Sequence, residues 1–130
     1  MNKKILVVDD TRACRDILAS IFEDRYEIIM AANGRQAIEV LNLQAFSVAV
    51  ILLDLIMPGM DGFEVLEYIN SKGWIESIPV VVVSGSEDEE VEKKCLDAGA
   101  KGFIKKPFFA KEASSVIEKI LEDNKDKTTL

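Results

Sequence analysis

Three short runs of aliphatic residues, in which apolar and polar positions do not alternate, constrain the fold of this 130-residue chain more than any other feature. They cover residues 5–8, 48–53 and 80–83. A strand of this kind is typical of a parallel sheet, because helices cover both of its faces. With two weaker runs, the pattern predicts strands at residues 4–8, 26–31, 48–53, 79–83 and 102–104, separated by amphipathic stretches.

The amphipathic stretches predict five helices. Apolar residues recur at helical spacing between the first two strands and again near the end of the chain. Asp61 with Glu64 resembles a capping box for the third helix. Ser86 with Glu89 does the same for the fourth, which we expect over about residues 87–98. This alternation predicts an α/β fold, a doubly wound five-stranded parallel sheet with five helices.

Length, charge and one missing residue type narrow the function. We expect one domain at residues 1–123 and a polar C-terminal tail at residues 124–130 that frays. The net charge of −7 has the wrong sign for a surface that binds nucleic acid or anionic lipid. No apolar run approaches the roughly 20 residues of a membrane-spanning helix, and no leader opens the chain, so we expect a cytoplasmic protein. The sequence contains no histidine, so carboxylates, hydroxyls and lysines must carry any chemistry.

Ionisable or hydroxyl side chains follow four of the five predicted strands. Asp9 and Asp10 follow the first strand, and Asp54 follows the third. Ser84 follows the fourth strand, and Lys106 comes shortly after the fifth. Doubly wound folds place their sites at the carboxyl ends of strands. If the first and third strands are neighbours, the three carboxylates converge in one small cleft.

Three anions in one cleft require a positive partner. At about 4 Å and an effective dielectric of about 20, each like-charged pair costs about 4 kcal/mol. Either the acids keep protons, or a lysine and a divalent cation neutralise them, and an all-oxygen site suits Mg²⁺. A metal, a lysine and a hydroxyl around one carboxylate are the groups that phosphoryl transfer to that carboxylate needs. Asp54 is the predicted nucleophile, because it follows the most apolar strand.

The residues at these positions resemble those of the receiver domains of bacterial two-component response regulators, in particular single-domain regulators of the chemotaxis type. The resemblance runs from Lys4 to about Leu121. It rests on VVDD at residues 7–10, LDLIMPGMDG at residues 53–62, SG at residues 84–85 and KPF at residues 106–108. It implies the flavodoxin-like, receiver type of doubly wound sheet.

The resemblance also implies a role for each phosphoryl-binding residue. Asp54 is then the phosphoacceptor, and Ser84 and Lys106 hydrogen-bond the new phosphoryl group. Phe103 stands at the aromatic switch position of the family, and it equally fits a simple core aromatic of the fifth strand.

The metal ligands follow from the same resemblance. Asp10 binds Mg²⁺ directly, Asp9 mostly through water, and Asp54 and the backbone carbonyl of Ile56 complete the protein ligands. Ile56 and Ser86 occupy positions at which the family varies its rate of self-dephosphorylation. Because the Ile56 side chain cannot orient an attacking water, we expect a longer-lived phosphorylated form than an Ile56→Asn variant would have.

The implied function is a phosphorylation-activated switch. A sensor histidine kinase or phosphotransfer protein donates a phosphoryl group to Asp54 in a Mg²⁺-dependent reaction. The domain then accelerates its own phosphorylation and dephosphorylation without being a metabolic enzyme. The face of the fourth helix, fifth strand and fifth helix, with Lys93, Lys94, Phe103 and Lys111, repacks and meets an unknown protein target. From the charge and the apolar runs we expect no direct contact with nucleic acid or membrane, and a phosphorylation-dependent dimer stays open.

Other functions fit the residues less well or stay open. An FMN carrier of the same fold needs a phosphate loop where Asp9 and Asp10 would repel the phosphate. A haloacid-dehalogenase-type phosphatase expects a second aspartate at the position of Ile56. A phosphorylation-independent interaction domain of the same fold stays open, as does a fragment of a longer regulator whose effector domain has been removed.

Overall fold

The computed structural model describes residues 4–86 and 88–128, which contain a single five-stranded sheet with strand order β2-β1-β3-β4-β5. All four neighbouring pairs run parallel, so the predicted parallel sheet is confirmed. The strands are β1 (Lys4–Val8), β2 (Glu27–Ala31), β3 (Val48–Leu53), β4 (Val80–Ser84) and β5 (Gly102–Lys105).

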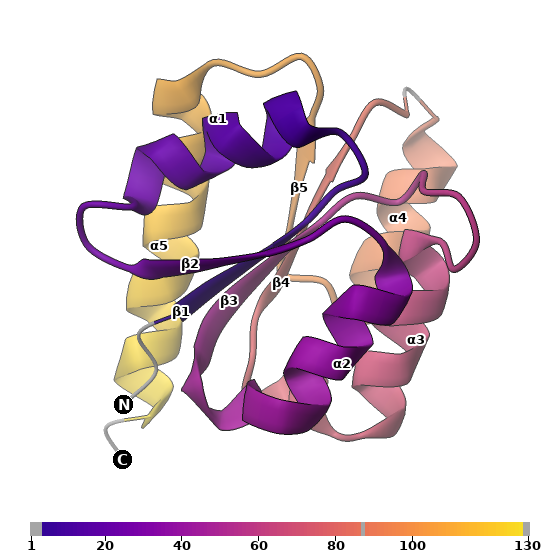
Figure 1. Ribbon diagram of the computed structural model, residues 1–130, viewed down its shortest axis with the longest axis horizontal. Helices are drawn as coiled ribbons and strands as arrows, with labels where there is room; N and C mark the ends of the chain where they lie inside the picture. Colours follow the sequence, from indigo (N-terminus) through magenta and orange to yellow (C-terminus); the bar gives the residue numbers. More distant parts are fainter. Residues whose placement is uncertain (1–3, 87, 129–130) are drawn as a thin grey trace.

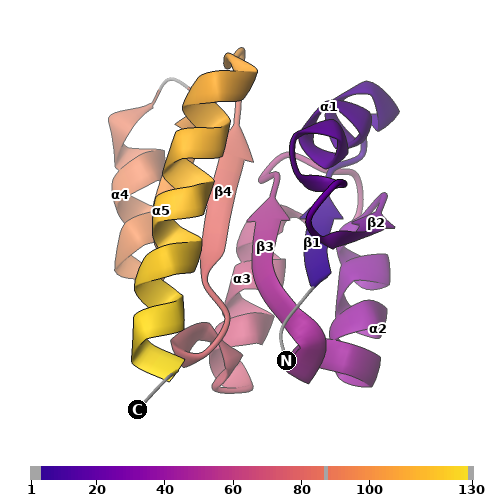
Figure 2. The ribbon, with the colours of Figure 1, turned by 90° about the vertical axis from the view of Figure 1, so that its left-hand side faces the viewer.

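Helices cover both faces of this sheet, as the unalternated strands required. One face carries α1 (Arg12–Phe22) and α5 (Ala110–Thr128), and the other carries α2 (Gly34–Gln44), α3 (Gly62–Ser71) and α4 (Glu89–Asp97) (Figure 1). The arrowheads of β1, β3 and β4 point to the same end of the molecule, where α5 begins (Figure 2). None of these helices is both long and apolar enough to cross a bilayer.

The core forms two main layers because successive strand residues point to opposite faces. In β1, Ile5 and Val7 pack with Leu18 and Phe22 of α1 and with residues of α5. Leu6 and Val8 pack in the opposite layer, with residues of α2 and α3. All six residues of β3 are buried, so the strand that precedes Asp54 is held from both sides.

The starts of α3 and α4 differ in how well their caps were predicted. Asp61 and Glu64 form the expected capping box, with the Asp61 carboxylate accepting from the Glu64 N–H at 2.9 Å. The expected cap at Ser86 is wrong: α4 begins at Glu89, and its cap is Asp88, which accepts from the Glu90 N–H at 2.9 Å. A carboxylate directly before the first turn takes the capping position that the more distant hydroxyl was expected to fill.

Three features depart from the predicted element boundaries. The 3₁₀ turns η1 (Ala45–Ser47) and η2 (Trp74–Glu76) precede β3 and β4 and had not been predicted. The last helix continues to Thr128 instead of ending near Asp123, since no glycine or proline interrupts that stretch. Part of the expected tail, residues 129–130, lies outside the described residues.

Candidate functional site

The carboxylates at the ends of β1 and β3 lie side by side. Val8 pairs with Leu53 across the two neighbouring strands, and the Asp54 N–H donates to the Val8 carbonyl at 2.9 Å. This register brings Asp9, Asp10 and Asp54 together, with one oxygen from each lying within 4.8 Å of the others. The convergence expected from the sequence is therefore present in the structure.

Lys106 lies among these carboxylates and carries the opposite charge. Its Nζ donates to Oδ2 of Asp9 at 2.7 Å and lies 3.8 Å from Oδ2 of Asp54. Asp9 and Asp54 are only 1% and 5% exposed, whereas Asp10 is exposed. The neighbouring Lys105 is exposed, so the lysine directly before Pro107 is the one that meets the acids. The cluster thus combines two buried carboxylates, one exposed carboxylate and one ammonium group.

Two residues that sequence reasoning missed fix the position of Asp9. The backbone N–H of Thr11 donates to Oδ1 of Asp9 at 2.8 Å. The guanidinium Nη1 of Arg15 donates to the backbone carbonyl of Asp9 at 2.7 Å. A hydrogen bond from a backbone N–H cannot be predicted from residue types. The position of Arg15, on the same helix face as the apolar residues of α1, was the available signal. Both partners join Asp9 to the first turns of that helix.

Burial makes the Asp54 carboxylate costly to ionise. Burial raises the pKa of Asp54 from its ordinary value of 3.8 to about 6. The positive charge of Lys106 and a hydrogen bond from the Ile56 N–H act to lower this pKa, while Asp9 and Asp10 raise it further. The Ile56 N–H donates to Oδ1 of Asp54 over a long 3.4 Å. Burial therefore outweighs the stabilisation that Lys106 gives to the ionised Asp54 carboxylate.

The Lys106 ammonium and the neighbouring Cys14 thiol stay protonated at neutral pH. Burial acts to lower the pKa of Lys106, but the hydrogen bond to Asp9 and the charge of Asp54 outweigh it, so the net shift is upward. Burial, followed by a hydrogen bond to Asp9, raises the pKa of the Cys14 thiol to about 11. Cys14 is thus a neutral neighbour of the acids and no nucleophile.

Ser84 and Ile56 border a cavity beside the cluster. Ser84 ends β4 fully buried, and its Oγ accepts from the Ser86 N–H at 3.5 Å. The side chain of Ile56 is 70% exposed. The cavity has a volume of about 330 Å³, and its lining is Leu55, Ile56, Met57, Asp61, Phe63, Ser84, Ser86 and Val91. The site therefore opens to solvent next to apolar side chains, and the Ile56 carbonyl stays a predicted ligand.

Phe103 lies in β5 and packs on a small cluster under α4. It is half-buried against Leu55, Val82, Cys95 and Ala100. This position fits a core aromatic, and it is also close enough in the sheet to follow Ser84, since β4 and β5 are paired. The switch role predicted for Phe103 stays a prediction.

Gly62 brings the start of α3 into direct contact with the backbone of the phosphoacceptor candidate. A Cβ at this position would lie 2.2 Å from the Asp54 carbonyl oxygen and 2.6 Å from the Leu55 Cα. The Gly62 N–H donates to the Leu55 carbonyl at 2.9 Å. Only glycine permits this approach, so the helix start supports Asp54 without an intervening side chain.

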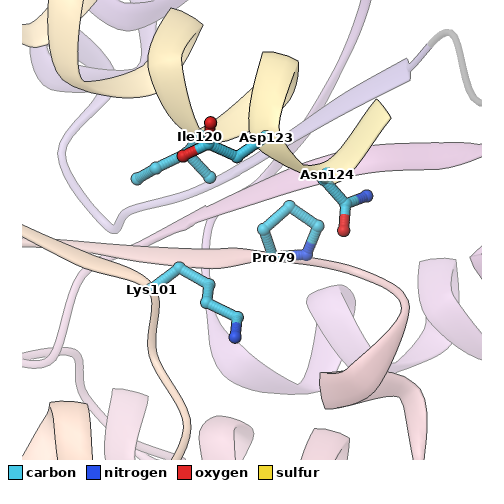
Figure 3. Close-up of a pocket in the computed structure, with 5 residues that line it drawn as sticks. All are labelled: Pro79, Lys101, Ile120, Asp123 and Asn124. Atoms are coloured by element: carbon cyan, nitrogen blue, oxygen red, sulfur yellow. The ribbon is translucent and has the colours of Figure 1, made fainter. Parts of the chain in front are cut away.

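Another cavity lies at the opposite end of the sheet, before β4 and β5. Its volume is about 290 Å³, and its lining is Pro79, Lys101, Ile120, Asp123 and Asn124. The charged ends of Lys101 and Asp123 lie on opposite sides of Pro79 (Figure 3). No residue of the acidic cluster lines this cavity. The chemistry predicted from the sequence belongs instead to the region around Asp54, at the carboxyl ends of β1 and β3.

The acidic cluster suits a hard divalent cation. Its three side-chain donors are all carboxylate oxygens, close enough to share one ion. Burial is the leading cause of the raised pKa of Asp54, so a bound cation would favour the ionised form of this carboxylate. Few protein ligands and open access to water favour Mg²⁺ over a fully caged metal. The residues present thus fit the predicted metal.

Comparison with known proteins points to one family. The sequence profile of the response regulator receiver domain matches residues 5–118. Response regulator RR06 of Streptococcus pneumoniae is 39% identical over 105 residues, which cover 80% of this chain but 46% of that regulator. Sporulation initiation phosphotransferase F of Bacillus subtilis is 33% identical over 122 residues, covering 93% of this chain and 95% of the relative. The chain thus spans less than half of one relative and nearly all of the other.

A solved structure agrees with this result. It is the CheX-CheY-BeF3-Mg²⁺ complex from Borrelia burgdorferi, one chain of which is 29% identical to this protein. The match has a TM-score of 0.85 and covers 91% of this chain and 88% of the other. Both the sheet order and the helix arrangement therefore have a close counterpart among solved proteins.

Proposed function

The chain belongs to the response regulator receiver domain family, and from this premise we propose that Asp54 accepts a phosphoryl group from the phosphohistidine of a partner protein. One observation carries the assignment of the residue. Asp54 is a buried carboxylate that has Asp9 and Asp10 within 4.8 Å and the Lys106 ammonium at 3.8 Å, whereas the other buried carboxylate, Asp9, is held by Lys106 at 2.7 Å. Because this chain has no histidine, the donor histidine belongs to a sensor kinase or a phosphotransfer protein.

The transfer follows from the geometry around Asp54. One Asp54 carboxylate oxygen attacks phosphorus while the phosphorus–nitrogen bond of the donor breaks, and the donor imidazole leaves with the electron pair. Lys106 is placed to turn from Asp9 toward the oxygens of the transferred group, since its Nζ already lies between the two acids. The Ser84 hydroxyl is placed at the neighbouring strand end to donate a further hydrogen bond.

Asp9, Asp10, Asp54 and the Ile56 carbonyl are the groups we propose for Mg²⁺. When bound, Mg²⁺ would supply positive charge to the carboxylates and to the oxygens of the transferred group. The Borrelia complex, which contains Mg²⁺ and BeF3 with a CheY chain, supports this choice for a related fold. The three-carboxylate cluster of the present chain supports it independently.

The signal would leave through α4, β5 and α5. Among the residues of α4 only Cys95 is buried, so this helix has little apolar anchorage. Lys94 lies 4.4 Å from the centre of the Phe63 ring, which lines the cavity next to Ser84. We propose that movement of Ser84 and Phe103 changes how α4 packs and so exposes a binding face to a protein target. Lys93, Lys94 and Lys111 are exposed on this face.

Intact-protein mass spectrometry tests the proposal. Treatment with acetyl phosphate and Mg²⁺ is expected to add the mass of one phosphoryl group to the wild-type protein. Asp54→Asn is expected to stay unmodified, while Asp97→Asn, which removes an exposed acid of α4, is expected to react like wild type. Excess EDTA is expected to stop the reaction. An unmodified wild-type protein, or a modified Asp54→Asn protein, would contradict the assignment.

Amide hydrogen exchange with and without acetyl phosphate separates the alternative function. A phosphorylation-independent interaction domain would bind its target without the phosphoryl group, and its amide hydrogen exchange would not respond to acetyl phosphate. The proposal instead predicts changes in exchange that concentrate in α4, β5 and the start of α5. Since the chain spans 46% of the RR06 length, a longer regulator with a further domain is the remaining alternative, and the same tests apply to it.

A further inference from the structure

An arginine lies on the buried stripe of α1. Leu18, Ala19 and Phe22 are the buried residues of this helix, and Arg15 precedes them by three, four and seven positions. Residues at these spacings share one face of a helix. Arg15 therefore occupies a position where the pattern calls for an apolar side chain. A charge on such a face needs a specific partner.

The partner is the backbone of the acidic cluster. Nη1 of Arg15 donates to the Asp9 carbonyl at 2.7 Å, and the Arg15 N–H donates to the Thr11 carbonyl at 3.1 Å. The Thr11 side chain makes no capping hydrogen bond, and no acid lies in the first turn of α1. The Arg15 guanidinium can only donate and so does not cap the helix, but it links α1 to the loop that carries Asp9 and Asp10 through the Asp9 carbonyl.

The hydrogen bond from Arg15 to the Asp9 carbonyl does not involve Lys106, whose contact with Asp9 must change during phosphorylation. In the proposed function, Lys106 turns from Asp9 toward the phosphoryl group, and Asp9 then loses its 2.7 Å ammonium contact. The hydrogen bonds from the Thr11 N–H and the Arg15 guanidinium do not involve Lys106, so they need not break in this exchange. The Thr11 N–H holds the Asp9 carboxylate, which is only 1% exposed, while Arg15 holds the Asp9 backbone.

We infer that Arg15 is a positioning residue for the Mg²⁺ site, holding the Asp9–Asp10 loop in metal-binding geometry through the Asp9 carbonyl. This inference rests on the proposed function and adds a residue to it. A guanidinium suits the task better than an ammonium because its planar donors are fixed relative to one another. The direction in which Mg²⁺ affinity changes when Arg15 is replaced distinguishes two effects of this residue. Its charge alone opposes Mg²⁺, whereas its hydrogen bond favours the metal.

The test uses Mg²⁺ titration of the full chain by calorimetry, with no phosphodonor present. Arg15→Met keeps the stem of the side chain and removes the donors. It is expected to weaken Mg²⁺ binding roughly threefold to tenfold, the range that corresponds to one net hydrogen bond. Arg15→Lys is expected to restore part of the affinity. Arg12→Met is the matched control, because Arg12 lies on the same helix, is 86% exposed and carries the same charge.

A second readout separates positioning from a general loss of structure. With acetyl phosphate, the Mg²⁺ concentration for half-maximal phosphorylation of Arg15→Met is expected to rise by the same factor, while the rate at saturating Mg²⁺ stays within about twofold of wild type. Unchanged or tighter Mg²⁺ binding by a folded Arg15→Met protein overturns the inference. If Arg15→Met does not fold, Arg15→Lys decides, and wild-type affinity for it overturns the inference too. Failure of the wild-type protein to bind Mg²⁺ would overturn the proposed function itself.

Discussion

Replacing Asp54 by asparagine is expected to stabilise the metal-free protein at neutral pH. Asp54 is 5% exposed, and burial raises its pKa from 3.8 to about 6. A shift of about 2 units corresponds to about 3 kcal/mol of unfavourable free energy for the ionised group in the folded chain. Asparagine has the shape of the protonated acid and avoids this cost. We therefore expect the free energy of unfolding of Asp54→Asn to exceed that of wild type by about 1–3 kcal/mol.

The pH dependence of this difference follows from proton binding. Between about pH 4 and pH 6, the folded chain holds more protons at Asp54 than the unfolded chain does. The contribution of this group to the free energy of unfolding therefore falls as the pH rises through this window, and it is constant above. The difference in the free energy of unfolding between Asp54→Asn and wild type should be largest above pH 6 and should shrink toward zero near pH 4.

Urea unfolding in EDTA at pH 7.5, 6 and 4.5 measures this gap. Glu39→Gln, which removes one charge from an exposed site of α2, is expected to differ little from wild type at each pH. Mg²⁺ is expected to stabilise the wild-type protein and narrow the gap, because it binds the folded state. If Asp54→Asn is less stable than wild type at pH 7.5, or if the gap does not narrow in acid, the account of a strained carboxylate fails.

Three further substitutions test other parts of the site. Ile56→Asn is expected to shorten the lifetime of the phosphorylated form several-fold, since an amide can orient the attacking water, and decay of the phosphorylated mass measures this. Lys106→Met is expected to lower the free energy of unfolding by about 2 kcal/mol at pH 7.5, because it leaves the Asp9 carboxylate without its ammonium partner, and partial exposure of Lys106 reduces the loss. Gly62→Ala is expected to destabilise the protein by about 2–4 kcal/mol and slow phosphorylation of Asp54, because the new Cβ would overlap the Asp54 carbonyl.

Matched variants keep these three results interpretable. Lys105→Met removes an exposed charge next to Lys106 and is expected to leave stability nearly unchanged. Gly85→Ala adds a methyl group where nothing lies within 4 Å, so its cost should be far below that of Gly62→Ala. A native phosphorylated form that decays as fast as that of Ile56→Asn would refute the role given to Ile56.

Most of the fold was predictable from patterns that burial imposes directly. The unalternated runs of β3 and β4 required helices on both faces, and the capping box of Asp61 and Glu64 marked the start of α3. The three-residue turns η1 and η2 were not predictable, because so short a turn has no periodicity. The cap of α4 was misplaced because several acids and a hydroxyl compete for that position.

The site was predictable in its side chains but not in its backbone contacts. The convergence of Asp9, Asp10 and Asp54 followed from strand ends alone, once β1 and β3 were taken as neighbours. The contact of Lys106 with Asp9 was not predicted, since the sequence cannot say which acid an ammonium meets first. The Arg15 contact was detectable only as a charge on the apolar stripe of α1, a signal that needs the helix phase to be known.

The glycine at the start of α3 has a mechanical consequence for signalling. The Gly62 backbone lies directly against the backbone of Asp54 and Leu55, so we expect the end of β3 and the start of α3 to move together when Asp54 is phosphorylated. Displacement is then expected on the other side of the cavity, where Cys95 is the buried residue of α4 and Val91 is partly buried beside it. An engineer who wishes to redirect the output could therefore diversify the surface of α4 freely while leaving residue 62 untouched.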